Sequence, residues 1–215
     1  MTESGAFRDA HHPEMLIWQA TQVPSRSLYY EGRGESFIPG YIDIGNKMKL
    51  CGVTKIAMCC NTAHMAIEEI AEAVGLPFIN ILQHVGGVIQ SKNVHKIGVM
   101  CSYSLANSGF YTQFINSGDK HLEVFYPDAE HQRMVTLGIC NAKNSKRFLE
   151  KYNVEHPCFL FSKVVSHLKD KGADCILAGC TDIRNVFYPT EDVLGDTIYV
   201  DCLDVMAETI IEESK

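Results

Sequence analysis

The sequence lacks the features that would direct it to a membrane, to secretion or to nucleic acid. Its 215 residues contain no apolar run approaching the roughly 18 residues that a spanning helix needs. Residues 1–13 are too polar for a signal peptide. The net charge of −7 argues against nucleic acid or an anionic membrane as the main partner. We therefore expect a cytoplasmic protein with a small-molecule partner, which can still be acidic if the pocket is locally positive.

The chain also lacks the cysteine spacings of metal sites and disulfide frameworks. No Cys-x-x-Cys occurs among its 9 cysteines and the histidines show no ligand spacing, so we expect no metal site. The pair His11 and His12 is better explained as a solvated N-terminal pair. The cysteine count is odd, and several cysteines lie inside apolar runs, which is typical of reduced thiols. These buried candidates are Cys59, Cys101, Cys175 and Cys202.

What the chain does have is a cysteine between a short apolar run and a capped helix. The run 56–59 is bounded by a Gly-Val-Thr turn and is typical of a buried parallel strand. Asn61 and Thr62 can cap a helix, and an apolar helical pattern continues over 63–74. Cys60 therefore lies where a strand ends and a helix begins, where backbone N–H groups and the helix dipole favour a thiolate.

The same arrangement returns 120 residues later. Gly172 precedes Cys180 by 8 residues, just as Gly52 precedes Cys60 by 8 residues, and a Thr-Asp cap follows the second cysteine. One cysteine at a strand end is more often a small buried residue than a functional one. Two in equivalent frames favour two similar lobes, each presenting a thiol to the cleft between them.

Short apolar runs alternate with helical patterns, which predicts an α/β fold with mostly parallel sheets. Strands are expected at residues 15–19, 56–59, 78–82, 96–101, 124–126 and 198–201, and directly before Cys180. Helices are expected at residues 41–50, 63–74, 84–92, 109–116, 130–140, 157–171 and 205–214, with a turn at 24–26 and a polar loop at 102–108. Residues 1–93 with a closing helix 203–215 would form the first lobe, and residues 94–202 the second.

These residues resemble the aspartate/glutamate racemase superfamily, and within it most of all the aspartate racemases. The resemblance covers most of the chain from about His12 onward, and its first cysteine motif is fairly specific. The matching segments are Cys60-Asn61-Thr62-Ala63-His64, Gly179-Cys180-Thr181-Asp182, His12-Pro13-Glu14, Val23-Pro24-Ser25-Arg26, Ile97-Gly98-Val99-Met100 and Ser108-Gly109-Phe110-Tyr111.

The resemblance implies two lobes related by pseudo-twofold symmetry, an active site in the cleft between them, and racemisation of an acidic amino acid without a cofactor. One of Cys60 and Cys180 would remove the α-proton and the other would return a proton to the opposite face. A planar carbanion must be reached from two sides, so two acid/base groups on opposing walls are the minimal apparatus. We also expect a homodimer.

Further residues are expected around the two thiols. Asn61, Thr62 and Thr181 can donate to the substrate α-carboxylate, although helix capping is an equally ordinary role for them. Ser102 is assigned to the same substrate-binding group. By resemblance, Arg26 binds the side-chain carboxylate; the simpler alternative is an exposed loop arginine.

Two residues are assigned supporting roles. His64 lies one helical turn after Cys60 and either sits near it or is a packed, hydrogen-bonded histidine. Asp182 stands where the family usually has glutamate. Cys140 occupies the place of a lysine that contacts the distal carboxylate in aspartate racemases, and Lys143 could replace it only if the loop shifts.

By the resemblance, the family opens with a strand and a Gly-rich loop, and we expect this chain to lack both. Strands 15–19 and 56–59 are therefore expected to pair directly, or to exchange between subunits, because unpaired strand edges are costly. Two alternative functions stay open. One is a decarboxylase or cis/trans isomerase that uses the cysteines differently, and the other is a catalytically impaired protein that binds an amino acid or a protein partner.

Overall fold

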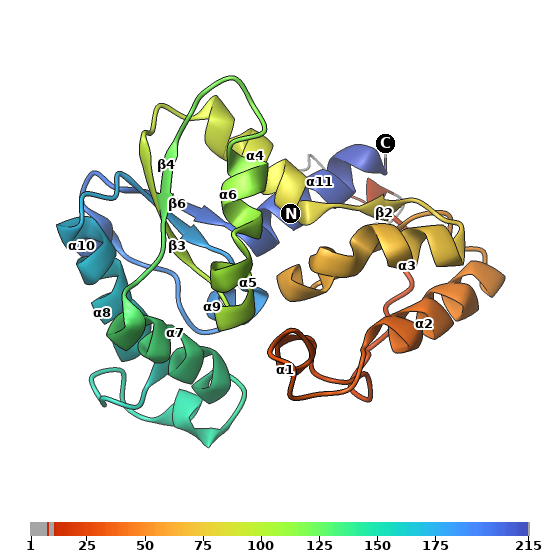
Figure 1. The fold of residues 1–215 in the computed structure, drawn as a ribbon, viewed down its shortest axis with the longest axis horizontal. Helices are drawn as coiled ribbons and strands as arrows, with labels where there is room; N and C mark the ends of the chain where they lie inside the picture. Colours follow the sequence, from red (N-terminus) through yellow and green to blue (C-terminus); the bar gives the residue numbers. More distant parts are fainter. Residues whose placement is uncertain (1–7, 9–10, 215) are drawn as a thin grey trace.

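The structure, a computed structural model, describes Arg8 and residues 11–214. Helices and strands alternate along the chain (Figure 1). The strands are β1 (Ile56–Ala57), β2 (Phe78–Ile79), β3 (Lys96–Met100), β4 (Glu123–Phe125), β5 (Cys175–Ala178) and β6 (Ile198–Asp201). The α-helices are α1 (Arg26–Tyr30), α2 (Ile38–Leu50), α3 (Ile67–Val74), α4 (Ile81–Ser91), α5 (Tyr103–Ser108), α6 (Phe110–Ile115), α7 (Ala129–Asn141), α8 (Pro157–Asp170), α9 (Thr181–Arg184), α10 (Glu191–Leu194) and α11 (Cys202–Glu213). Two 3₁₀ helices, η2 (Asn61–Ala66) and η3 (Ser145–Phe148), complete the described elements.

The strands form two parallel sheets, which confirms the predicted α/β fold. β1 pairs with β2, and the larger sheet has the order β4-β3-β5-β6. In Figure 1 the larger sheet lies on one side of the molecule, and the smaller sheet with α2 and α3 lies on the other. Because β5 is flanked by strands on both sides and is buried along its whole length, it reads as an uninterrupted apolar run.

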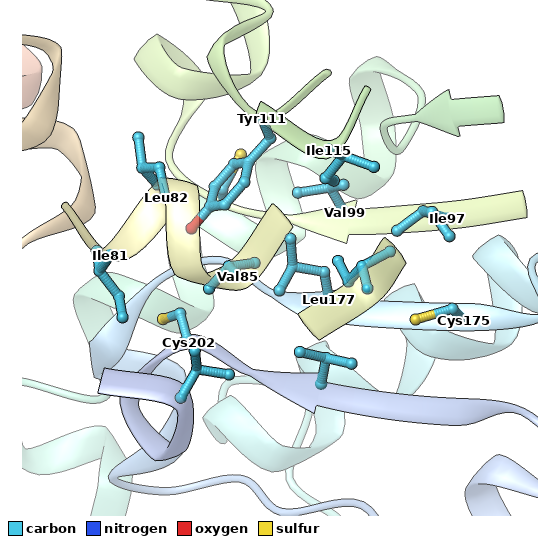
Figure 2. Close-up of a cluster of buried hydrophobic side chains, with 14 of the residues drawn as sticks. Ile81, Leu82, Val85, Ile97, Val99, Tyr111, Ile115, Cys175, Leu177 and Cys202 are labelled. Atoms are coloured by element: carbon cyan, nitrogen blue, oxygen red, sulfur yellow. The ribbon is translucent and has the colours of Figure 1, made fainter. Parts of the chain in front are cut away.

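The larger sheet has an apolar core on each face. Cys175 and Leu177 of β5 point into one cluster, and the alternate residues Ile176 and Ala178 point into the other. The first cluster includes residues of α4, α6 and α11, several of which Figure 2 labels. A third cluster, whose buried residues lie between Phe37 and Val74, is the core around the small sheet. The lobe boundaries at residues 93 and 202 stay a prediction.

The 120-residue spacing seen in the sequence extends to whole elements. β2 and β6 begin 120 residues apart, at Phe78 and Ile198, and the starts of α2 and α8 differ by 119 residues (157 − 38). Two pairs of glycines at this spacing have positive φ, a conformation that a Cβ disfavours. They are Gly52 (87°) with Gly172 (91°), and Gly75 (67°) with Gly195 (58°). The two halves are therefore consistent with similar lobes.

The segment 15–19 is not a strand, contrary to expectation. Its apolar side chains face solvent, with Ile17 exposed to 82% and Met15 to 61%. A strand needs a hydrogen-bonding neighbour, and within the described part of the chain β1 pairs with β2 alone. The direct pairing predicted between residues 15–19 and 56–59 does not form.

Three smaller expectations are wrong because polar residues act as helix caps. The expected turn at 24–26 is the start of α1, where Ser25 Oγ accepts a bond from the amide of Leu28. The expected loop at 102–108 is α5, capped by Ser102 in the same way. The strand predicted over 78–82 ends at Ile79, since Asn80 caps α4. Helices of five or six residues are too short to show a periodic pattern.

Among the described residues, none of the helices has both the length and the apolar character needed to cross a membrane. All 9 cysteines are unpaired. Cys101, Cys175 and Cys202 are buried as predicted, whereas Cys59 is exposed. The reason is that β1 ends at Ala57, so Cys59 lies beyond the strand and outside the core.

Candidate active site

The two cysteines predicted to react occupy matching positions at strand–helix junctions. Cys60 precedes η2 with φ −140° and ψ 104°, and Cys180 precedes α9 with φ −141° and ψ 127°. Both thiols are half-buried. The helix expected over 63–74 is divided into η2 and α3, so the helix that begins at each cysteine is short.

Arg26 lies beside Cys60 at the start of α1. Burial alone would lower the pKa of the guanidinium, but the neighbouring sulfur of Cys60 and the hydroxyl of Tyr41 raise it above its usual value. Arg26 Nη1 donates to the carbonyl oxygen of Pro24 over 3.2 Å, while Nε is buried and has no hydrogen-bond partner among the residues that the structure describes. This half-buried arginine therefore has an N–H group available for a carboxylate, and its positive charge lies beside the sulfur of Cys60.

Cys180 has an anion as its neighbour instead. Its sulfur lies 3.7 Å from Asp182 Oδ2, and burial together with this carboxylate raises the pKa of Cys180 to about 12. Lys143 Nζ forms an ion pair with Asp182 Oδ2 at 2.7 Å. Cys180 is therefore a neutral thiol near neutral pH, and Lys143 brings a cation to its side of the site.

His64 supports the backbone of Cys60. It is buried, and its Nδ1 lies 3.0 Å from the carbonyl oxygen of Cys60. Burial lowers the pKa of His64, so the ring is neutral and Nδ1–H donates to this carbonyl. Of the two interpretations offered by the sequence, the geometry favours the packed, hydrogen-bonded histidine.

The polar residues after each cysteine connect the two halves of the molecule. Asn61 Nδ2 donates to the carbonyl oxygen of Gly179 over 2.9 Å, and Thr181 Oγ1 donates to the carbonyl oxygen of Cys59 over 2.9 Å. Thr62 Oγ1 and Ser102 Oγ are 2.9 Å apart. The predicted site residues thus come together from distant parts of the chain, and contact between these four polar side chains and a substrate stays a prediction.

Two residues of this region were given no role from the sequence. The hydroxyl of Tyr111 donates to Gly179 O over 3.1 Å and lies 2.8 Å from Asn61 Nδ2, while Cys202 Sγ lies 2.9 Å from the same nitrogen. Figure 2 shows the hydroxyl of Tyr111 on the side of the ring nearer Cys202. The sequence reflects this contact only through the glycine at position 179. Any other residue there would place its Cβ 2.7 Å from the Tyr111 ring.

A pocket of about 260 Å³ lies between α1, η2 and α5. It is lined by Tyr30, Glu31, Met65, Tyr103, Ser104, Asn107 and Ser108. Neither Cys60 nor Cys180 lines it. The pocket adjoins the contact of Ser104 Oγ with the carbonyl oxygen of Ser27, which joins α5 to α1.

Asp128, His131 and His167 bring possible metal-ligand atoms within 4.8 Å of one another, which the sequence spacing did not predict. The two imidazole rings are stacked with their centroids 3.7 Å apart, and each ring has a nitrogen beside a carboxylate oxygen of Asp128. Asp128 also accepts from the backbone N–H of His131 and caps α7. We interpret this group as a cap with stacked histidines.

Known proteins with similar sequences and folds include racemases. A broad-specificity amino-acid racemase (RacX) of Bacillus subtilis is 25% identical over 184 residues, covering 85% of this chain and 74% of the relative. A glutamate racemase of a Carnobacterium species is 24% identical over 210 residues, covering 90% of this chain and 72% of the relative.

Solved structures with a similar fold are also racemases. The aspartate racemase of Picrophilus torridus superposes with a TM-score of 0.80 at 20% identity, over 97% of this chain and 83% of that one. A glutamate racemase of Francisella tularensis in complex with D-glutamate gives 0.59 at 18% identity, over 92% and 68%. The sequence model of the Asp/Glu/Hydantoin racemase family matches residues 2–210. The chain belongs to the Asp/Glu/Hydantoin racemase family.

Proposed function

We propose that this protein racemises an acidic amino acid, aspartate or glutamate, by transferring protons between two thiols without a cofactor. The observation that carries the proposal is the unequal pair of environments. Arg26, with its unpartnered Nε, lies beside Cys60, while Cys180 is held as a neutral thiol next to Asp182. One base and one acid are what a proton exchange at a single carbon requires.

In the proposed reaction the Cys60 thiolate takes the α-proton and leaves a carbanion stabilised by the substrate carboxylate. The Cys180 thiol then gives its proton to the opposite face of the same carbon. One S–H bond forms and one breaks, so the reaction needs no oxidant, reductant or net proton. The enzyme ends with the two protonation states exchanged, and the reverse reaction starts from that state.

The preference for a second carboxylate is assigned to the cations of the site. Arg26 is positioned to pair with a carboxylate near Cys60, and such charge-assisted bonds are directional. Lys143 reaches the Cys180 side, although it is paired with Asp182 in this structure. The chain thus has a cation near the position at which Cys140 replaces the family's lysine.

Supporting proposals concern the setting in which the enzyme works. We propose that it functions in the cytoplasm, where unpaired thiols remain reduced, because all 9 cysteines are free. We further propose that it forms a homodimer.

The test is isotope exchange combined with chiral analysis. The protein is incubated with L-aspartate, L-glutamate and L-alanine in D₂O, and loss of the α-proton and appearance of the D-enantiomer are followed by NMR and chiral chromatography. Exchange and inversion of an acidic amino acid are expected. Exchange of the α-proton of alanine alone would mean that the substrate is not acidic. A decarboxylated or isomerised product would favour a decarboxylase or a cis/trans isomerase. Binding of an amino acid without exchange of its α-proton would favour a catalytically impaired racemase.

A further inference from the structure

We propose that Asn61 and Thr181 form a reciprocal clamp that fixes the relative position of the two thiols. Each is the residue directly after one reactive cysteine, and each donates to the carbonyl of the residue directly before the other. Asn61 Nδ2 donates to Gly179 O, and Thr181 Oγ1 donates to Cys59 O, both over 2.9 Å. Both are therefore positioning residues in the proposed two-thiol reaction, on which this inference rests.

The two bonds are counterparts of each other. At the 120-residue spacing Asn61 corresponds to Thr181, and Cys59 corresponds to Gly179. The peptide in front of each reactive cysteine is thus held by the segment that carries the other one. A displacement of either segment would stretch both bonds, so the pair resists movement more than one bond would.

The donors of both side chains are already engaged. Asn61 Nδ2 has two hydrogens, and Gly179 O, Tyr111 OH and Cys202 Sγ all lie within 2.8–2.9 Å of it. A threonine hydroxyl has one hydrogen, which Thr181 gives to Cys59 O. Neither side chain keeps a donor for a substrate carboxylate while the clamp is closed.

The two halves of the clamp differ in how firmly they are held. Gly179 is buried, its carbonyl also accepts from Tyr111, and its N–H donates to Met100 O over 2.8 Å. Cys59 is exposed, and Thr181 is half-buried. Thr181 can therefore be changed without opening the core, which makes it the residue to test.

Positioning matters because the two sulfurs must address one carbon from opposite faces. A misplacement of about 1 Å can lower a rate by roughly 10²-fold. Exchange of the α-proton on one face needs one correctly placed thiol, whereas inversion needs both. Loosening the clamp should thus slow inversion more than exchange.

The experiment compares Thr181→Val, which removes the hydroxyl at nearly constant shape, with Thr181→Ser, which keeps it. For Thr181→Val we expect kcat for racemisation to fall by roughly 10- to 100-fold, with KM changed less than about threefold and the ratio of inversion to exchange lowered. Thr181→Ser should recover most of kcat. The matched control is Thr209→Val, which removes a 2.8 Å bond to Val205 O inside α11 and should leave kcat nearly unchanged.

A second measurement does not depend on turnover. Hydrogen–deuterium exchange should be faster in Thr181→Val in peptides covering both 56–64 and 175–184, while Thr209→Val affects α11 only. Unchanged exchange in the 56–64 peptide would overturn the clamp, as would a raised KM at constant kcat, which would make Thr181 a substrate contact. If the natural protein neither exchanges the α-proton of any amino acid nor inverts it, the proposed function fails. The amide hydrogen–deuterium exchange of the protein would still show whether the clamp exists.

Discussion

Cys60 and Cys180 share a backbone position but not an environment. Cys60 follows a two-residue strand in a two-stranded sheet and lies beside the cation Arg26. Cys180 follows a fully buried four-residue strand in the middle of a four-stranded sheet and lies beside the anion Asp182. Similar segments in matched frames thus have opposite electrostatic surroundings, and in the proposed reaction this difference makes Cys60 the base and Cys180 the acid.

The two cysteines also differ in the hydrogen bonds that hold the residue in front of each of them. The carbonyl before Cys180 accepts from the side chains of Asn61 and Tyr111, and the N–H of the same residue, Gly179, donates to Met100 O. Among the described residues, the carbonyl before Cys60 accepts from one side chain, that of Thr181. His64 adds a bond to the carbonyl of Cys60 itself. We infer that the segment of Cys180 is anchored in the larger core and that the segment of Cys60 depends on a contact from the other half.

The largest effect is expected from removing either thiol. Cys60→Ser and Cys180→Ser should each lower racemisation by roughly 10²- to 10⁴-fold, because an alcohol is a much poorer acid/base group near neutral pH. Cys180→Ser should retain more α-proton exchange than Cys60→Ser, since the base next to Arg26 is intact. Chiral chromatography and NMR in D₂O measure both.

The control for these variants is Cys51→Ser, which changes an exposed thiol at the end of α2. It should racemise at the natural rate. Full racemisation by Cys180→Ser would remove the two-thiol mechanism from consideration.

The next effect concerns the cation beside Cys60. Arg26→Lys should lower kcat/KM for aspartate by about 10- to 100-fold, mainly through KM, because hydrogen bonds to charged groups contribute about 1.5–3 kcal/mol and lysine cannot form the bidentate pair. Arg33→Lys is the matched control, as Arg33 is exposed and pairs with Glu31 on the surface. A preference for aspartate over alanine that does not change in Arg26→Lys would make Arg26 a loop residue only.

Alkylation rates should separate the two thiols by pH. Only the thiolate reacts, and with a pKa of about 12 Cys180 is deprotonated to roughly 10⁻⁴ at pH 8. Iodoacetamide followed by peptide mass spectrometry should therefore label Cys60 much faster than Cys180. Labelling of Cys180 should rise with pH up to about 12, where its folded-state pKa lies.

Asp182→Asn sharpens this test. It removes the neighbouring anion that raises the pKa of Cys180, so labelling of Cys180 should become faster at pH 8. Equal labelling of the two thiols in the natural protein would mean that their environments do not differ as the structure indicates.

The smallest effect is expected on stability, from replacing two cysteines that have no role in the proposed reaction. Cys175→Ser places a hydroxyl in the apolar core of β5 and should lower the free energy of unfolding by about 1–3 kcal/mol. Cys59→Ser, at an exposed position, should change it by less than about 0.5 kcal/mol. Urea denaturation measures both, and equal losses would contradict the difference in burial.

Much of the fold could be predicted because the long, buried elements carry periodic apolar patterns. β3, β5 and β6, and the helices α7, α8 and α11, lie within a few residues of their predicted positions. The wrong predictions concern segments in which the apolar pattern alone does not determine the secondary structure. Residues 15–19 are apolar enough for a strand but have no strand beside them, and α1 and α5 are single short turns set by a cap.

The sequence by itself determined the two matched cysteine frames, since a repeat of 120 residues is visible in the spacing of glycines and cysteines alone. It also determined the α/β order, because strand and helix periods are local properties of the chain. Only the tertiary structure decided that Arg26 lies beside Cys60, whereas Asp182 is already two residues from Cys180 in the sequence. Arg26 and Cys60 are 34 residues apart (60 − 26), so their contact depends on how the first half folds. The bonds of Asn61 and Thr181 join residues 118 and 122 apart, so they depend on how the two halves dock.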